Sequence, residues 1–194
     1  MKLYTKNGSY PEPIPFRIKL SNGQTRTDPS SFSDEEIIDA GYIEVPNPPV
    51  ITQEQVLEWY PANLAWIVRS KTQQEIDNLK TLRINYITES RDDQLNSLIC
   101  NWNGDTWDAR ETDSTRIANV LTMIEQAQTI DMPTPSTIDW RTYDDQDRTL
   151  TIPDLIQLAA CMFMAQQIVW GKQAQLKNAI AAATTVEEVN SIVW

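Results

Sequence analysis

Two tryptophans beside carboxylates are the first residues whose types and spacing could do chemistry. The segment CNWNGDTWDARETDSTR, residues 100–116, places Trp102 and Trp107 around an Asn-Gly pair, with acidic residues behind. Exposed indoles beside Asp form aromatic platforms that bind sugars or partner proteins. A two-residue turn at Asn103-Gly104 would instead put both indoles on one face of a hairpin, where cross-strand aromatic pairs stabilise by roughly 0.2–1 kcal/mol. We expect a hairpin packed on a core, with the platform as the alternative.

Three carboxylates in the segment DDQD, at Asp144, Asp145 and Asp147, are the next candidates. They lack the glycine and the distal glutamate of a calcium loop, so we expect a solvated hairpin tip and no metal site. The chain contains no histidine, which removes the commonest general base, the Ser-His-Asp triad and most zinc sites. It also has no phosphate-binding glycine loop.

Paired-carboxylate chemistry needs two acids at a set distance across a cleft, and with 27 acidic residues some pair always seems available. We therefore assign no catalytic, cofactor-binding or metal residue. We expect no enzyme and no cofactor.

The net charge and the composition of the chain limit the classes of molecule that it is expected to bind. A net charge of −11 argues against nucleic acids and anionic membranes, because phosphate contacts need clustered Lys and Arg. No run of about 18 apolar residues is present, so we expect no bilayer span, and the N-terminal residues lack the apolar region of a signal peptide. Cys100 and Cys161 are far apart in the sequence, and Cys161 is expected to act as a small hydrophobe on a helix.

Residues 1–70 predict short strands punctuated by proline, since they hold eight of the eleven prolines. The alternation in FRIKLSNGQTRT predicts a hairpin with a type I′ turn at Asn22-Gly23. SDEE at 33–36 has the form of a capping box, which predicts a short helix ending at Gly41 and a strand at 42–45. VLEWYPANLAWIVR fits two strands around a turn at 60–63. Its alternative is a helix capped by Thr52 and ended by Pro61.

From residue 71 the apolar period becomes helical. A helix of some 25 residues is expected, and a second helix follows Thr112 or Asp113. The first helix is expected to bury one stripe, formed by Ile76, Leu79, Leu82, either Tyr86 or Ile87, Leu95 and Leu98. IDWRTYDDQDRTLTI predicts a hairpin, a third helix starts near Pro153, and TTVEEV starts a short C-terminal helix with another capping box. Trp102, Trp140 and Trp170 are expected to be mostly buried, tying both hairpins to the third helix.

The predicted fold class is α+β. A β-rich, proline-punctuated attachment region, residues 1–70, is followed by a helical domain, residues 71–194, which is a helical bundle with two small β-hairpin insertions.

The first 15 residues predict a docking arm. Leu3, Tyr4, Tyr10 and Ile14 show no period that would bury them in their own domain, and three prolines keep this segment extended. Ordering each residue costs about 1–2 kcal/mol and needs a surface to offset it, so we expect these side chains to bind a neighbouring protein. The alternative is that the arm folds back on its own hairpin as an edge strand.

The C-terminal part resembles a known family. RDDQLNSLICNWNGDTWDARETDSTRIANVL, IDWRTYDDQDRTLTIPDLIQLAACM and WGKQAQLKNAIAAATTVEEVNSIVW are similar to a domain of unknown function recurrent in bacteriophage tail proteins. The resemblance covers about residues 75–194. The segment PFRIKLSNGQTRTDPSSFSDEEIIDAGYIEV is similar, less specifically, to the start of phage tail-fibre proteins.

This resemblance implies a tail setting and carries over no catalytic residue. We expect a structural virion protein of the tail, made in the host cytoplasm: a short fibre, a fibre adaptor or a baseplate-associated protein. Its expected partners are other tail subunits, in a homo-oligomer or a larger assembly. The alternative is a tail-fibre assembly chaperone, and a carbohydrate-binding receptor module comes third. The chain lacks the long repetitive shaft of a full fibre.

Overall fold

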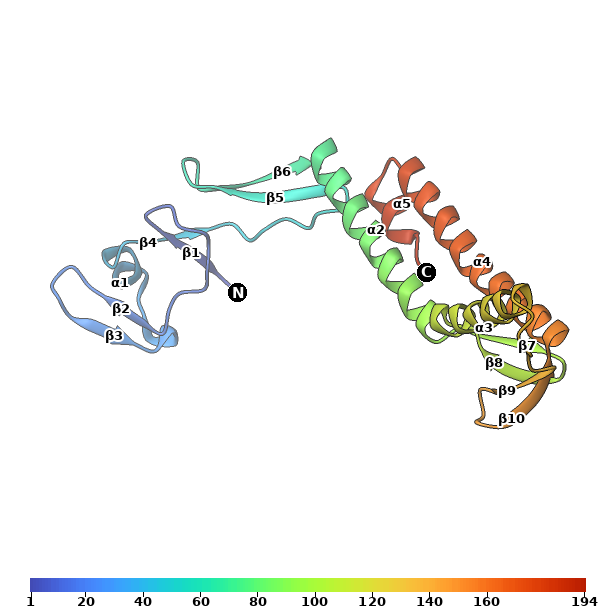
Figure 1. Ribbon diagram of the computed structural model, residues 1–194. Coiled ribbons are helices and arrows are strands. Elements are labelled where there is room, and N and C mark those ends of the chain that lie inside the picture. Colours follow the sequence, from blue (N-terminus) through green and yellow to red (C-terminus); the bar gives the residue numbers. More distant parts are fainter. The chain divides into compact units, whose positions relative to one another are not determined.

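The computed structural model describes residues 1–194 as two compact units, Met1–Ile76 (unit 1) and Asp77–Trp194 (unit 2) (Figure 1). The fold class is α+β, as predicted. All strands lie in five two-stranded antiparallel sheets, and four of these are hairpins between neighbours in the sequence. The fifth sheet pairs the first strand with the fourth.

Unit 1 is built around the pairing of β1 (Leu3–Lys6) with β4 (Tyr42–Val45), in which Tyr4 lies opposite Glu44. A capping box starts α1 (Asp34–Asp39): the Ser33 hydroxyl accepts from the Glu36 N–H, and the Glu36 carboxylate accepts from the Ser33 N–H. This helix was located correctly from the sequence. A short 3-10 helix, Pro29–Ser31, precedes it. The buried apolar side chains of this unit include Tyr4, Ile18, Ile37, Ala40 and Val45.

The hairpin of β2 (Arg17–Lys19) and β3 (Thr25–Thr27) forms where the alternation predicted it, but its turn is of another type. Only Gly23 has a positive φ, of 87°, and Asn22 does not. The Gly23 N–H donates to the Leu20 carbonyl, and the Leu20 N–H to the Gln24 carbonyl. This is a type I turn followed by a left-handed glycine, so the type I′ prediction was wrong.

The segment with two tryptophans before residue 71 forms β5 (Gln55–Tyr60) and β6 (Ala65–Ser70), and the alternative helix was wrong. Trp59 and Trp66 lie opposite each other, with ring centroids 5.2 Å apart in an edge-to-face arrangement. Their indole N–H groups donate to the carbonyls of Gly8 and Pro46. The aromatic pair therefore ties this hairpin to two proline-rich loops of the same unit.

Helices dominate the C-terminal part. They are α2 (Gln73–Asn96), α3 (Glu111–Thr129), α4 (Ile152–Ala182) and α5 (Val186–Ser191). Capping boxes at Thr151 and Thr185 start α4 and α5. By contrast, α3 begins slightly earlier than predicted, after Arg110, and no side chain caps it.

Two hairpins are inserted between these helices, as predicted: β7 (Ile99–Trp102) with β8 (Asp105–Asp108), and β9 (Thr137–Arg141) with β10 (Asp147–Thr151). The Arg148 guanidinium donates to both carboxylate oxygens of Asp105, each at 2.9 Å, and so joins the two hairpins. The Tyr143 N–H adds a backbone link to the Thr106 carbonyl.

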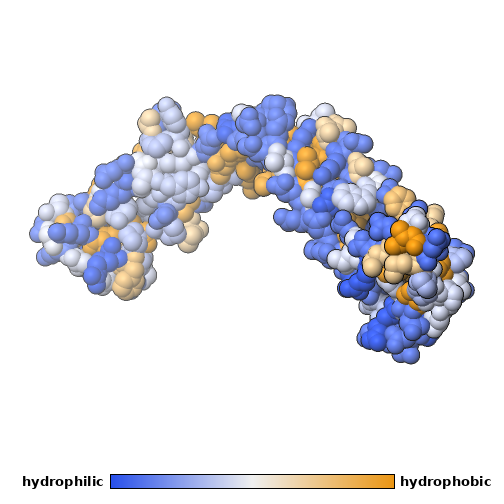
Figure 2. Space-filling model, in the orientation of Figure 1, coloured by the Kyte–Doolittle hydropathy of each residue, from blue (hydrophilic) through white to orange (hydrophobic).

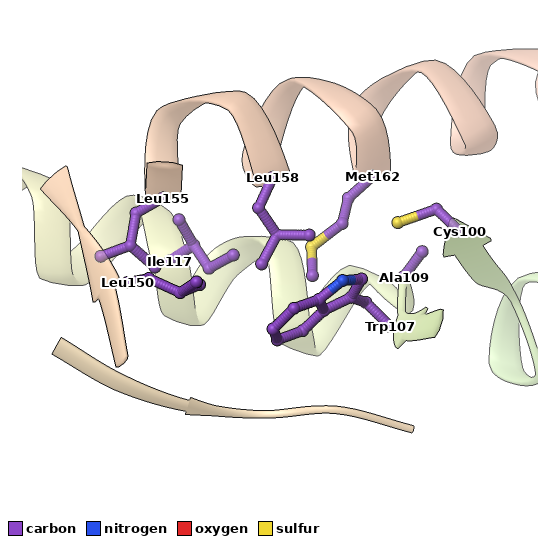
Figure 3. Close-up of a cluster of buried hydrophobic side chains, with 8 residues drawn as sticks. All are labelled: Cys100, Trp107, Ala109, Ile117, Leu150, Leu155, Leu158 and Met162. Atoms are coloured by element: carbon purple, nitrogen blue, oxygen red, sulfur yellow. The ribbon is translucent and has the colours of Figure 1, made fainter. Parts of the chain in front are cut away.

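The core of unit 2 lies where both hairpins meet α3 and α4 (Figure 3). Trp107 stands at its centre, among Leu158 and Met162 of α4 and Ile117 of α3. The predicted stripe of α2 was right at Ile87, which is the one fully buried residue of that helix, and wrong at Leu82, which is exposed, as is the alternative Tyr86. Two side-chain hydrogen bonds link this helix to α4: Arg91 donates to the buried Gln173, whose amide donates to Thr88.

Candidate interaction surfaces

The two indoles of the first hairpin are core residues. Asn103 and Gly104 both have positive φ, at 52° and 85°, and Trp102 lies opposite Asp105, as a type I′ turn requires. Trp107 is 1% exposed, and its N–H donates to the Trp102 carbonyl at 3.1 Å. Trp102 is half-buried against the core. An open platform made by Trp102 and Trp107 therefore does not exist in this structure.

Trp140 and Trp170 differ from each other. Trp140 is half-buried against the core, but Trp170 is 43% exposed, so the expectation that it is mostly buried was wrong. The buried stripe of α4 passes through Val169, and the next residue of a helix points about 100° away. Trp170 instead lies beneath Arg91, whose guanidinium is 4.5 Å from the ring centroid.

The N-terminal arm folds back on its own unit, which corrects the expectation of a free docking segment. Tyr4 is 8% exposed and exchanges two backbone hydrogen bonds with Glu12, while Leu3 is half-buried in β1. Tyr10 is exposed, but its ring contacts Trp66 edge-to-face at 5.4 Å. Ile14 is half-buried. Pairing with β4 gives hydrogen-bond partners to backbone N–H and C=O groups of β1, for which no partner strand was predicted from the sequence.

A polar hollow of about 490 Å³ contains most of the acidic segment singled out in the sequence. Arg141 pairs with Asp147 at 3.0 Å, Asp145 lies at the turn with φ 60°, and Asp144 accepts from Thr142 just outside the hollow. Across it, Arg110 pairs with Asp113 at 2.7 Å. No group of three or more His, Cys, Asp or Glu is arranged to hold a metal ion. Ion pairing within the hollow occupies most of its charges.

An apolar hollow of about 570 Å³ opens in unit 1, between α1 and β4. Its exposed apolar residues are Ile38 and Ile43, and Asp34 and Glu44 add carboxylates to its lining. Tyr4 forms part of its wall. The arm thus helps to build this surface.

A second apolar groove, of about 620 Å³, runs along α4 beside β7 in unit 2. Met164 and Ile168 of α4 are 67% and 74% exposed, and Ile99 of β7 is also exposed. Figure 2 shows hydrophobic residues on the surface of both units. The sequence contains a signal for this groove, because residues 155–171 include no charged residue, but such a run is equally typical of a core helix.

By length and composition alone, α4 is also apolar enough to cross a membrane, with 22% of its apolar window buried. This differs from the expectation that no segment qualifies. Alanines and glutamines interrupt the apolar run without adding charge, so the helix passes on its average.

The groove also contains a contact between the two cysteines that sequence separation concealed. Cys100 of β7 and Cys161 of α4 are hydrogen-bonded to each other, and both are free thiols. Burial raises the pKa of Cys100 to about 12, and the contact with Cys161 adds to the shift. Cys100 is therefore a protonated thiol at neutral pH.

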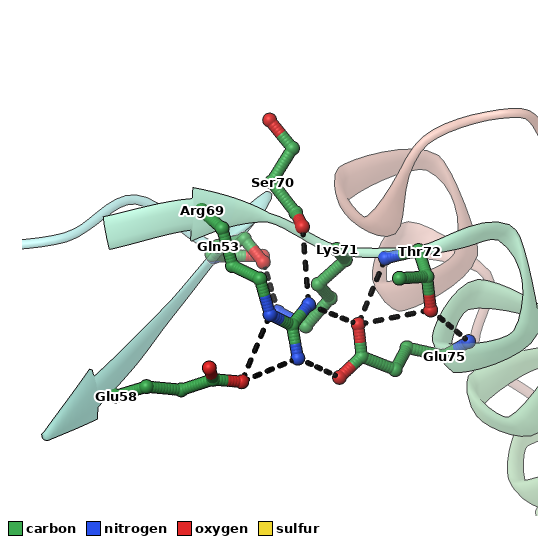
Figure 4. A network of polar contacts seen from close by, with 7 residues as sticks. All are labelled: Gln53, Glu58, Arg69, Ser70, Lys71, Thr72 and Glu75. Atoms are coloured by element: carbon green, nitrogen blue, oxygen red, sulfur yellow. Dashed lines mark hydrogen bonds and ion pairs between the residues drawn. The ribbon is translucent and has the colours of Figure 1, made fainter. Parts of the chain in front are cut away.

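The start of α2 is fixed by the densest ionic network of unit 1 (Figure 4). The Arg69 guanidinium binds the carboxylates of Glu58 and Glu75, and Glu75 also accepts from the Thr72 N–H at 2.8 Å. The Glu75 N–H in turn donates to the Thr72 hydroxyl, completing a capping pattern. The Arg69 contact, with the Thr72 hydrogen bonds, lowers the pKa of Glu75 to about 2.

Fold and surfaces together define a two-unit α+β protein with an apolar hollow in each unit and a polar hollow lined by ion pairs. The chain belongs to the family described as Domain of unknown function (DUF4376), which matches residues 78–193. The match ends one residue before the C-terminus and lies wholly within unit 2. No curated protein and no solved structure matches the chain.

Proposed function

We propose that this protein is a structural component of a bacteriophage tail, an adaptor or a fibre- or baseplate-associated subunit that makes protein–protein contacts. One observation carries the proposal: each of the two units has its own apolar surface, the α1–β4 hollow in one and the α4 groove in the other. Contiguous exposed apolar patches mark protein contacts in soluble proteins. Two such surfaces on separate units suit an adaptor between two neighbours.

The tail setting itself rests on the resemblance of residues 75–194 to phage tail proteins. The docking element proposed for unit 1 is now the α1–β4 hollow with Ile38 and Ile43, because the N-terminal arm is used internally. Its carboxylates, from Asp34 and Glu44, favour a partner segment that combines apolar and basic side chains.

Mass spectrometry of purified phage particles tests the role. A structural subunit is present in fixed stoichiometry, whereas an assembly chaperone is made in the infected cell and absent from the particles. Absence would therefore replace the proposal by its alternative.

A matched pair of variants tests the surface. Ile43→Glu places a charge in the hollow and is expected to lower incorporation into particles at least tenfold, since a buried unpaired charge opposes association. Val50→Glu places the same charge on a fully exposed residue of the same unit and is expected to leave incorporation unchanged. Equal incorporation of both variants would reject the hollow as a docking surface.

A further inference from the structure

The exposed stripe of α4 has an ordered charge pattern. Residues spaced by three or four along a helix share one face, and this rule aligns Asp154, Gln157, Cys161, Met164, Ile168 and Lys172. Every residue between the two charged ends of this stripe is uncharged. The stripe forms one wall of the 620 Å³ groove, with Ile99 of β7 beside it.

We propose that this stripe is a self-association surface, on which α4 of a second copy packs antiparallel. The partner proposed for this stripe differs from the partner proposed for unit 1. Self-association can be tested on the purified protein, whether or not the protein belongs to a phage tail. The charge pattern of the stripe favours a second copy as its partner. Two chains of net charge −11 repel each other as wholes, but along this stripe they can approach through a face whose centre carries no charge.

The charged ends fix the direction. Asp154 and Lys172 are 18 residues apart, which is five turns and about 27 Å, so both point to the same side of the helix. About a two-fold axis that crosses the stripe between Cys161 and Met164, Asp154 of each copy meets Lys172 of the other, twice in the dimer. A parallel pair would instead oppose Asp154 to Asp154 and Lys172 to Lys172.

The middle of the stripe fits a close helix pair. Met164 and Ile168 supply flexible and branched apolar side chains, and Ala160 and Ala165 flank them with small ones. Antiparallel helices packed at 8–10 Å in this way bury apolar area in both copies at once. Both charged residues also act within their own chain, because Asp154 caps α4 and Lys172 lies 4.7 Å from the Trp194 ring centroid.

Sedimentation equilibrium of the full chain tests the surface. The wild type is expected to dimerise in the micromolar range. Met164→Glu is expected to raise the dimer dissociation constant at least tenfold, because it buries two unpaired charges. Met123→Glu is the matched control: this methionine of α3 is as exposed as Met164 but lies off the stripe, and its variant should dimerise as the wild type does. A monomeric wild type, or equal effects of the two variants, would overturn the proposal.

A charge exchange tests the direction. Lys172→Glu places a glutamate opposite Asp154 of the other copy at both ends of the dimer. This repulsion is expected to weaken the dimer about three- to tenfold at low salt. Lys177→Glu makes the same charge change on another face of α4 and should have little effect. Adding Asp154→Lys to Lys172→Glu restores an opposite-charge pair and should recover most of the affinity, with circular dichroism checking that α4 stays folded after loss of its cap. No recovery in a folded double variant would reject the antiparallel arrangement.

Flotation with phosphatidylcholine vesicles separates the second copy from a lipid surface. A monomeric wild type that floats, and whose Met164→Glu variant does not, would assign the stripe to membrane and overturn self-association.

Discussion

Single residues show how similar tryptophans take unlike places in this fold. Trp107 fills the centre of the core of unit 2, while Trp170 lies under a guanidinium at the surface. Local composition would have placed them the other way round, because Trp107 lies between Asp105 and Asp108 whereas Trp170 follows Ile168 and Val169. The side-chain periodicity of the strand or helix decides whether each indole is buried. Trp107 shares a hairpin face with Cys100, whereas Trp170 is one residue past the buried stripe of α4.

Trp107→Ala is expected to destabilise unit 2 by about 3–5 kcal/mol, because it empties a fully buried aromatic site. Trp170→Ala should cost about 1 kcal/mol or less, the worth of an exposed cation–π contact. Urea unfolding followed by far-ultraviolet circular dichroism measures both. Equal losses for the two variants would contradict the assignment of the core.

Glu75 gives a stability term that depends on pH. Its pKa is lowered to about 2 in the folded chain from an ordinary value of 4.5, so folding favours the ionised form. The stabilisation is complete above pH 4.5 and is lost as pH falls towards 2. Glu75→Gln should therefore melt below the wild type at pH 6, and the difference should shrink between pH 4.5 and 2.

Glu89→Gln is the control for this titration, since Glu89 is an exposed residue of the same helix without an ion pair. Its melting should follow the wild type across the whole pH range. A gap between wild type and Glu75→Gln that stays constant down to pH 2 would show that the Arg69 network does not act through this carboxylate.

Among the elements, β1 shows the largest difference between the role predicted from the sequence and the role observed in the structure. Its residues looked like a free arm because the partner strand, β4, lies some forty residues later. Local patterns cannot report such a pairing, since it is decided by which distant strand offers matching backbone groups. Elements set by local chemistry were found instead: the capping boxes at Ser33, Thr151 and Thr185, and the turn at Asn103-Gly104.

The same distinction explains the candidate surfaces. The Cys100–Cys161 contact and the place of Ile99 in the α4 groove could not be read from spacing, because each joins a residue of β7 to residues some sixty positions later. The turn at Asn22-Gly23 is a different case, in which a local signal was present but predicted the wrong turn type. The same dipeptide that gives a type I′ turn in a two-residue loop gives a bulged turn when the loop has three residues and the strands close at Leu20 and Gln24.

Tyr4→Ala is expected to destabilise unit 1 by about 3–5 kcal/mol, since Tyr4 is a buried aromatic residue of the strand that closes the unit. Tyr10→Ala should cost only about 0.5–1.5 kcal/mol, the value of one edge-to-face contact. Thermal unfolding followed by near-ultraviolet circular dichroism compares them. Unchanged melting of Tyr4→Ala combined with lost particle assembly would restore the free docking arm.

At the scale of the whole molecule, the two units have separate interiors. The buried cluster of unit 2 runs from Cys100 to Met162 and lies within the family match, residues 78–193. Tyr4, Ile18 and Ile37 belong to the other interior. Each unit therefore has the internal contacts that independent folding requires.

A fragment covering residues 71–194 is expected to fold by itself, as the sequence period already suggested. Its circular dichroism should be mainly helical, because α2 to α5 make up most of it. Cooperative thermal unfolding would distinguish a packed domain from isolated helices. A strand-dominated or featureless spectrum would show that residues 1–70 are needed for its fold.

The five two-stranded sheets have a consequence for the backbone. In such a ribbon each strand is paired on one side only, so every second amide points away from its neighbour towards solvent. Tyr4 is an exception, since its N–H donates to the Glu12 carbonyl. Deuterium uptake should accordingly alternate along the strands, with slow and fast amides in turn, while the interior amides of α4 stay uniformly slow. Slow exchange at the outward amides of a given strand would then report that another chain has joined the ribbon there.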